Sequence, residues 1–354
     1  MKIKLAIIDS DRNYLDRLSA TITTKYSEML EVYSFTDIQN AEEQVLEKKP
    51  DVIIASEECK IDHKKLPRRC AFAYFVESQG IESIKDMPAI CKFQKVELIY
   101  KQVLGLYSEK AQGVLSVSLE NVSCATVAFT SPCGGTGTTT VAMAAAVAFS
   151  KKGKRVFYLD YETFGISELY FSAEGTANMS DVIFSLKSKK SNIALKLESC
   201  MKLSPTGVTF FSQPKVALDM LELDEENALY LIDYIKNSGK FDVIVINMEF
   251  SMNSFAKAIL DKVDRIVAVS DGTETVNYKF KRVYEALEIK EQDKDYKTVE
   301  KLCVMYNKFS NKGGQMLPQN VVRSIGGAPR YEHATNKQIV DQLSTMAIFE
   351  GILA

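Results

Sequence analysis

The stretch from Ser131 to Thr140, SPCGGTGTTT, indicates the fold of the larger part of this chain. It stands between an apolar run at 124–131, typical of a buried strand, and an alanine-rich run at 138–152, typical of a buried helix. In this setting a Walker A loop reads G-x-x-x-x-G-K-[ST]. Here Pro132 replaces the first glycine and Thr138 replaces the lysine. We therefore expect a phosphate-binding loop that has lost its own cation.

Such a loop keeps most of the groups that hold a phosphate. Backbone N–H groups and the positive end of the following helix supply much of the binding, and a threonine hydroxyl remains for Mg²⁺. The missing charge matters most during phosphoryl transfer. Binding is thus expected to survive where fast hydrolysis does not, and the alternative is a glycine turn without a ligand. The residues expected at the nucleotide are Cys133, Gly134, Gly135, Thr136, Gly137, Thr138, Thr139 and Thr140.

Polar residues follow the later strands, where ligands bind in open α/β sheets. Asp160 ends the apolar run at 154–160, and Glu162 comes two residues later. These carboxylates are the candidates for holding Mg²⁺ or orienting an attacking water, with Thr139 and Asp160 as the expected metal ligands. Asn247 ends the run at 241–247, where a Walker B strand would carry an aspartate. This is a second loss of charge from the site.

Three more residues are expected near the base of a nucleotide. Asn307 follows the apolar run at 299–306, and its side-chain amide is suited to pairing with an adenine edge. Pro329 and Arg330 come after the last predicted strand, at 324–329, and are expected to lie against the base. A single helix is expected from 336 to 354, with its apolar end packed on the domain.

The whole chain is predicted to be α/β, with two domains that are each a mostly parallel sheet covered by helices. The boundaries are expected at 1–110 for the first domain, 111–123 for a linker and 124–354 for the second. A net charge of −2 gives no reason to expect a nucleic-acid partner. Seven scattered cysteines with two histidines argue against a zinc site and fit a reducing cytoplasm. No run reaches the length of a membrane span.

Residues 124 to about 350 resemble the MinD/ParA group of deviant Walker A ATPases, whose loop reads K-G-G-x-G-K-T-T. In this comparison Cys133 replaces the signature lysine that reaches across an ATP-sandwiched dimer. The resemblance implies ATP and Mg²⁺ as cofactors and a homodimer as the assembly. It also implies that Thr139 binds the metal, that Thr140 lies beside the α-phosphate and that Asn307 reads adenine.

Residues 1–110 resemble a response-regulator receiver domain. Asp9 and Asp11 match its acidic pair, and Lys92 matches the lysine after its fifth strand. Ser56 stands where the phosphoacceptor aspartate ends the third strand, so no acyl phosphate can form at that position. The segment is therefore interpreted as a pseudo-receiver that contacts partners or its own copy.

A pseudo-receiver followed by a degenerate MinD-like domain resembles the TadZ/CpaE family. This resemblance implies an ATP-binding factor that localises and assembles a bacterial Tad (Flp, type IVb) pilus secretion machine, with the nucleotide mainly structural or regulatory. It implies a cytoplasmic, polar protein peripheral to the inner membrane, whose membrane contact is indirect or weak. The alternative is a MinD/ParA-like ATPase that turns over ATP while cycling on membrane or DNA. A phosphorelay receiver is disfavoured by Ser56.

Overall fold

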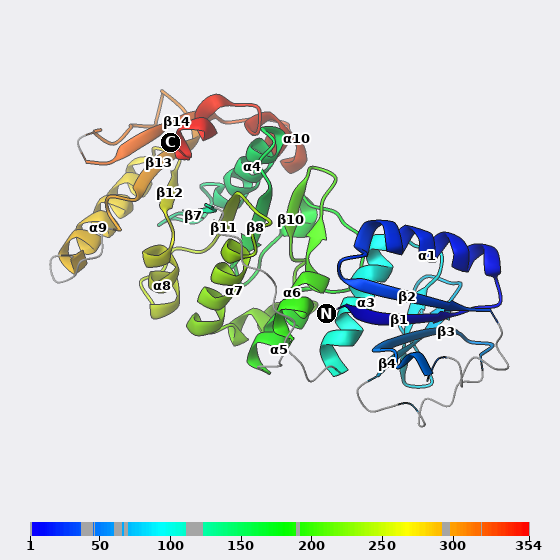
Figure 1. Cartoon of the computed structure of the whole chain (residues 1–354). Coiled ribbons are helices and arrows are strands. Elements are labelled where there is room, and N and C mark those ends of the chain that lie inside the picture. The colour runs from blue at the N-terminus through cyan, green and yellow to red at the C-terminus, as the bar shows by residue number, and fades with distance from the viewer. Residues whose placement is uncertain are drawn as a thin grey trace. The chain divides into compact units, whose positions relative to one another are not determined.

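The computed structural model describes residues 2–36, 45, 47–59, 66, 70–110, 123–188, 192–291, 298–319 and 321–353 (Figure 1). By their internal contacts the residues form two units. One is Met1–Val117 with Phe184–Cys200, and the other is Ser118–Ile183 with Met201–Ala354. The predicted linker at 111–123 lies outside the described residues except for residue 123.

The first unit contains a six-stranded sheet in the order β2-β1-β3-β4-β6-β5. All of its pairs are parallel except β5 with β6. Side chains of β1 alternate between two buried clusters, so both faces of the sheet are covered by apolar side chains. The elements are β1 (Ile3–Ile8), α1 (Arg12–Tyr26), β2 (Leu30–Phe35), β3 (Val52–Ser56), β4 (Ala71–Val76), β5 (Ser83–Ile84), β6 (Met87–Cys91) and α3 (Val96–Lys110).

Helix α6 (Ile193–Cys200) comes from the middle of the chain but belongs to the first unit. It packs on α3, where Leu195 joins the apolar cluster and Lys196 forms an ion pair of 3.0 Å with Glu109. A Cβ on Gly105 of α3 would lie 3.6 Å from Ser199 Oγ, an ordinary contact distance, so the packing of the two helices does not require glycine there. The segment lies within 124–354, the range predicted for the second domain.

The second unit contains an eight-stranded sheet in the order β14-β13-β12-β7-β11-β8-β10-β9. Among the described strands of this sheet, only β9 and β10 pair in the antiparallel direction. The predicted α/β class with mostly parallel sheets is therefore confirmed. The strands are β7 (Ala125–Thr130), β8 (Val156–Asp160), β9 (Lys202–Leu203), β10 (Val208–Phe210), β11 (Val243–Asn247), β12 (Arg265–Ser270), β13 (Leu302–Phe309) and β14 (Arg323–Pro329).

Helix α4 (Thr138–Lys151) lies against this sheet and is buried from Val141 to Phe149. Alanine suits this position because its small side chain lets the helix approach the sheet closely. The other helical elements of the second half are α5 (Met179–Lys187), α7 (Glu225–Asn237), α8 (Ser254–Lys262), α9 (Glu274–Glu291), α10 (Asn336–Leu343), η2 (Ser167–Leu169), η3 (Ala217–Glu222) and η4 (Ala347–Ile352). None of the described helices is both long and apolar enough to span a membrane.

The expectation of one helix from 336 to 354 is wrong. Helix α10 ends at Leu343, and the extended residue Met346 separates it from the 3₁₀ helix η4. The break lets Phe349 and Ile352 enter the same buried cluster as α4, so the expected packing of this apolar end is confirmed.

Helices α8 and α9 were not predicted. In α9 only Val276, Phe280 and Leu287 are buried. The helical spacing of apolar residues is therefore weak in this charged sequence.

Candidate functional site

The glycine loop joins the carboxyl end of β7 to the first turn of α4. Gly135 and Gly137 both have left-handed backbone, with φ of +84° and +87°. Gly137 is the N-cap of α4 and has no side chain to cap it, so the first-turn N–H groups stay available to an anion. The Ser131 hydroxyl accepts a hydrogen bond from the Cys133 N–H at 3.2 Å and fixes the entry to the loop.

Gly137 is required by a close neighbour as well as by its backbone. The Asn307 side chain is buried, and its Nδ2 donates to the Thr136 carbonyl at 2.8 Å. A Cβ on residue 137 would collide with the same Nδ2. The residue expected to read adenine thus also holds the loop, a contact that the sequence analysis did not predict.

Replacing Gly137 by alanine should therefore lower the free energy of unfolding by roughly 1–3 kcal/mol, because alanine strains at positive φ and displaces the Asn307 amide. Gly134→Ala is the matched control, since a Cβ there meets nothing within 4 Å and the backbone does not have positive φ. Thermal unfolding of both variants without ligand measures the difference. Equal melting temperatures would show that the Asn307 contact does not stabilise the loop.

The carboxylates lie where β8 and β11 run side by side. Asn247 of β11 lies opposite Asp160 of β8 in the parallel register, and its Nδ2 donates a hydrogen bond to Asp160 Oδ1 at 3.0 Å. Thr139 Oγ1 lies 3.0 Å from each carboxylate oxygen of Glu162. The predicted hydroxyl, the two acids and Asn247 therefore converge at the start of α4.

Burial changes the charge behaviour of these acids. It raises the pKa of Asp160 to about 7, and the neighbouring Glu162 carboxylate adds to the shift. Burial also raises the pKa of Glu162, against the lowering effect of its hydrogen bond from Thr139. An added cation would offset both shifts, because it favours the ionised form of each carboxylate.

The donor set suits Mg²⁺. It offers a hydroxyl and carboxylates, all oxygen ligands, and Asp160 Oδ2 is buried without a hydrogen-bond partner among the described residues. No group of three or more His, Cys, Asp or Glu able to hold a metal occurs in the described part of the chain. Mg²⁺ commonly takes one or two carboxylates together with substrate phosphates and waters. Thr139 and Asp160 would hold it, and the ion would supply charge to bound phosphates.

The raised pKa predicts how stability depends on pH. The unfolded carboxyl ionises near its ordinary pKa of 3.8 and the folded one near 7. Between these two pKa values the folded protein keeps a proton on Asp160 that the unfolded chain has lost. The free energy of unfolding therefore falls as the pH rises toward 7. Between pH 5 and pH 8 the free energy of unfolding should fall by about 2–3 kcal/mol more in the wild type than in Asp160→Asn. Denaturant unfolding without ligand at both pH values tests this, and parallel declines would contradict it.

A cavity of about 530 Å³ opens beside the loop. It is lined by Thr140, Asn307, Pro329 and Arg330, four residues that the sequence analysis assigned to the nucleotide. The remaining lining residues are Lys308, Tyr331, Glu332, His333, Asn336 and Ile339. The Thr140 hydroxyl lies 3.4 Å from the Tyr170 hydroxyl at its edge. The structure thus brings Thr140 and the expected base-binding residues to one hollow.

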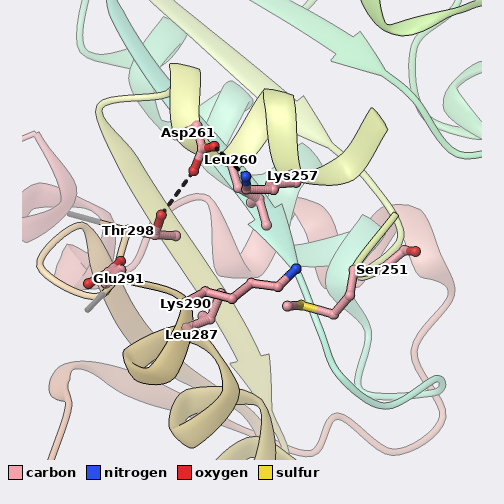
Figure 2. A pocket seen from close by; sticks show the side chains of 9 residues that line it. Ser251, Lys257, Leu260, Asp261, Leu287, Lys290, Glu291 and Thr298 are labelled. Carbon is pink, nitrogen blue, oxygen red and sulfur yellow. Dashed lines mark hydrogen bonds and ion pairs between the residues drawn. The ribbon is translucent and has the colours of Figure 1, made fainter. Parts of the chain in front are cut away.

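A second pocket, between α8 and α9, is much smaller, at about 30 Å³. Figure 2 shows Asp261 accepting a hydrogen bond from Thr298 at 3.1 Å and facing Lys257 at 3.9 Å. The bond from Thr298 links two walls of the pocket, whereas the pair with Lys257 lies within α8. None of the predicted site residues lines it, and its volume is too small for a nucleotide.

In the first unit the residues of the acidic site bind one another. Lys92 Nζ lies 2.6 Å from Asp9 Oδ2, where the Asp9 side chain is buried and the Lys92 side chain is mostly covered. The other oxygen of Asp9 accepts from the Asp11 N–H at 2.9 Å, while Asp11 caps helix α1. Ser56 is buried with its hydroxyl 3.3 Å from Cys59 Sγ. The lysine therefore neutralises the acid that a receiver would use for a metal.

Comparison with known families shows what this unit is similar to. Residues 1–108 match the family described as the TadZ-like receiver domain. Ser56 and the Asp9–Lys92 pair agree with a receiver that has no phosphoacceptor. The comparison with curated proteins finds no match.

The rest of the chain resembles solved ParA and MinD structures. A ParA family ATPase from Chlorobium tepidum is 16% identical with a TM-score of 0.51, and the match covers 66% of this chain and 98% of that one. MinD of Pyrococcus furiosus is 16% identical with a TM-score of 0.43, covering 65% and 99%. MinD of Pyrococcus horikoshii, complexed with Mg-ADP, is 15% identical with a TM-score of 0.45, covering 62% and 94%.

At this level of identity the first of these similarities shows the fold alone. The predicted arrangement, a TadZ-like receiver domain followed by a ParA-like fold, is confirmed. Sequence reasoning missed Lys308 and Tyr170, which reach the loop region from β13 and from the segment after η2. No spacing signal could have found them, because both are placed by tertiary packing.

Proposed function

We propose that this chain binds ATP with Mg²⁺ and serves as a localisation and assembly factor for a Tad pilus secretion machine. The TadZ-like receiver domain and the ParA-like fold support the Tad context. The observation that carries ATP binding is the uncapped start of α4 beside the cavity formed with Asn307, Pro329 and Arg330. The cavity volume of about 530 Å³ is within the range of small-molecule sites.

The nucleotide acts as a structural part of a homodimer in this proposal. Thr138, Cys133 and Asn247 stand at three positions where a charged side chain would support phosphoryl transfer, and none of them carries a full charge suited to that role. The turnover ATPase cycling on membrane or DNA is the alternative. One feature supports this alternative. Asp160 and Glu162 remain in the site as carboxylates that can position a metal and a water.

Sedimentation of the full chain with and without ATP–Mg²⁺, combined with an assay of released phosphate, tests this proposal. We expect a dimer that forms with ATP–Mg²⁺ and persists without phosphate release. ADP–Mg²⁺ serves as the control for the γ-phosphate. Dimerisation that ignores nucleotide would remove the structural role, and dimers that dissolve as phosphate appears would favour the turnover alternative.

A further inference from the structure

Strand β13 carries a lysine to the glycine loop from outside the loop. Between its pairs with Gly327 and Pro329 of β14, β13 has two residues, Asn307 and Lys308, where β14 has one. Such a bulge redirects side chains. Both residues reach loop carbonyls, because Asn307 Nδ2 donates to Thr136 O at 2.8 Å and Lys308 Nζ donates to Gly135 O at 2.9 Å.

The backbone of Lys308 is left-handed, with φ of +58°. This conformation disfavours any residue with a Cβ, and glycine or asparagine would adopt it with less strain. Strain of this kind persists where the surrounding structure holds it, and it is frequent at ligand sites. At this strained position Lys308 extends a cationic side chain to the loop. A glycine would avoid the strain but would have no side chain to reach the loop.

The lysine side chain runs close to the place where the loop lacks its own lysine. Its Cε would lie 3.6 Å from a Cβ built on Gly137, the residue directly before Thr138. Thr138 itself contributes no charge, and its hydroxyl lies 3.2 Å from that of Thr136. Lys308 also lines the cavity together with Thr140 and Arg330.

We propose that Lys308 supplies the positive charge to the nucleotide phosphates that Thr138 cannot supply. An ammonium has three donors, so one bond to Gly135 O leaves two for phosphate oxygens. Charge-assisted bonds of this kind are stronger than neutral ones. The inference rests on the proposed ATP site and adds to it the cation that holds the phosphates.

The position of Lys308 suits binding more than phosphoryl transfer. Its ammonium is anchored to a loop carbonyl before any ligand arrives. A second lysine, Lys279 of α9, has its Nζ 3.9 Å from Cys133 Sγ at the start of the loop, but it does not line the cavity. Lys308 is therefore the lysine assigned to the phosphates, while Arg330, which also lines the cavity, is assigned to the base.

Calorimetric titration with ATP–Mg²⁺ and with adenosine tests the inference on the full chain. Lys308→Gly should weaken ATP about 10- to 100-fold, as expected for the loss of a charged hydrogen bond, and leave adenosine nearly unchanged. Its melting temperature without ligand should be equal to or above that of the wild type, because glycine removes the strain. Lys312→Ala, which removes an exposed lysine from the following turn, is the control and should bind ATP normally. Adding Thr138→Lys to Lys308→Gly should restore much of the lost affinity.

The outcomes separate this inference from the proposed function. ATP binding within twofold of the wild type in Lys308→Gly would overturn the inference and leave the ATP site intact. No ATP binding by the wild type would overturn the proposed function first. Lower melting temperatures in both Lys308→Gly and Lys308→Asn, with equal losses for ATP and adenosine, would make the lysine a structural clamp and would also contradict the inference.

Discussion

Wild-type protein saturated with ATP–Mg²⁺ is expected to turn over on the order of 10⁻³ s⁻¹ or slower, about 10⁴-fold below a typical enzyme. Charge builds on the phosphoryl oxygens and the leaving oxygen in the transition state, and removing one stabilising group costs roughly 10²–10⁵ in rate. This site has Thr138, Cys133 and Asn247 where charged groups would act. Such losses do not simply add, but a single one is enough for slow turnover.

Restoring the loop lysine tests the explanation. Thr138→Lys should raise phosphate release measurably, since Thr139, Asp160 and Glu162 remain around the same point. Thr138→Val is the matched control, because it keeps the shape of threonine without adding charge. Wild-type turnover near one per second that disappears in Glu162→Ala would contradict the account, because it would require a cation that works in the transition state.

Lys92→Met should lower the free energy of unfolding by about 3–5 kcal/mol, the usual effect of leaving a buried charge unpaired. Lys92 Nζ lies 2.6 Å from Asp9 Oδ2, and the exposed fractions of the two side chains are 11% and 1%. Asp9 would keep only the backbone N–H of Asp11 as a partner within the described residues. Chemical denaturation of the full chain gives the change.

Two variants show whether the charge is responsible. Adding Asp9→Asn to Lys92→Met should recover much of the loss, since a neutral amide is less costly to bury than a carboxylate. Arg12→Met removes an exposed ion pair with Asp16 in the same unit and should change stability by less than about 1 kcal/mol. If Lys92→Met and Arg12→Met had similar small effects, the buried pair would not hold this unit together.

The sequence was sufficient for the parts of the fold that local chemistry decides. Apolar runs that end in Asp160 and Asn247 are strands in parallel register, and their ends meet as open α/β sheets require. Glycine at 135 and 137 corresponds to two left-handed positions in the loop. Asp9, Ser56 and Lys92 indicated the receiver-like unit and its missing acceptor through the resemblance to receiver domains. Each of these features depends on residue type and spacing along the chain.

The remaining features depend on contacts between distant segments. Lys308 reaches Gly135 through a bulge whose extra residue is defined only by the partner strand β14. Asn307 was predicted from its place after a strand, but its bond to Thr136 spans 171 positions in the sequence. Helix α6 carries apolar residues that fit either unit, and only packing on α3 assigns it to the first. Helix α9 is mostly exposed and charged, so its apolar period was too weak to recognise.

The central claim is that a glycine loop without its lysine still binds ATP. The most direct test is a calorimetric titration of the full chain with ATP–Mg²⁺, followed by thermal unfolding at the same ligand concentrations. The account predicts saturable heat and a rise in melting temperature that grows with free ATP, as binding to the folded state requires. No heat and no rise in melting temperature at millimolar ATP–Mg²⁺ would contradict it.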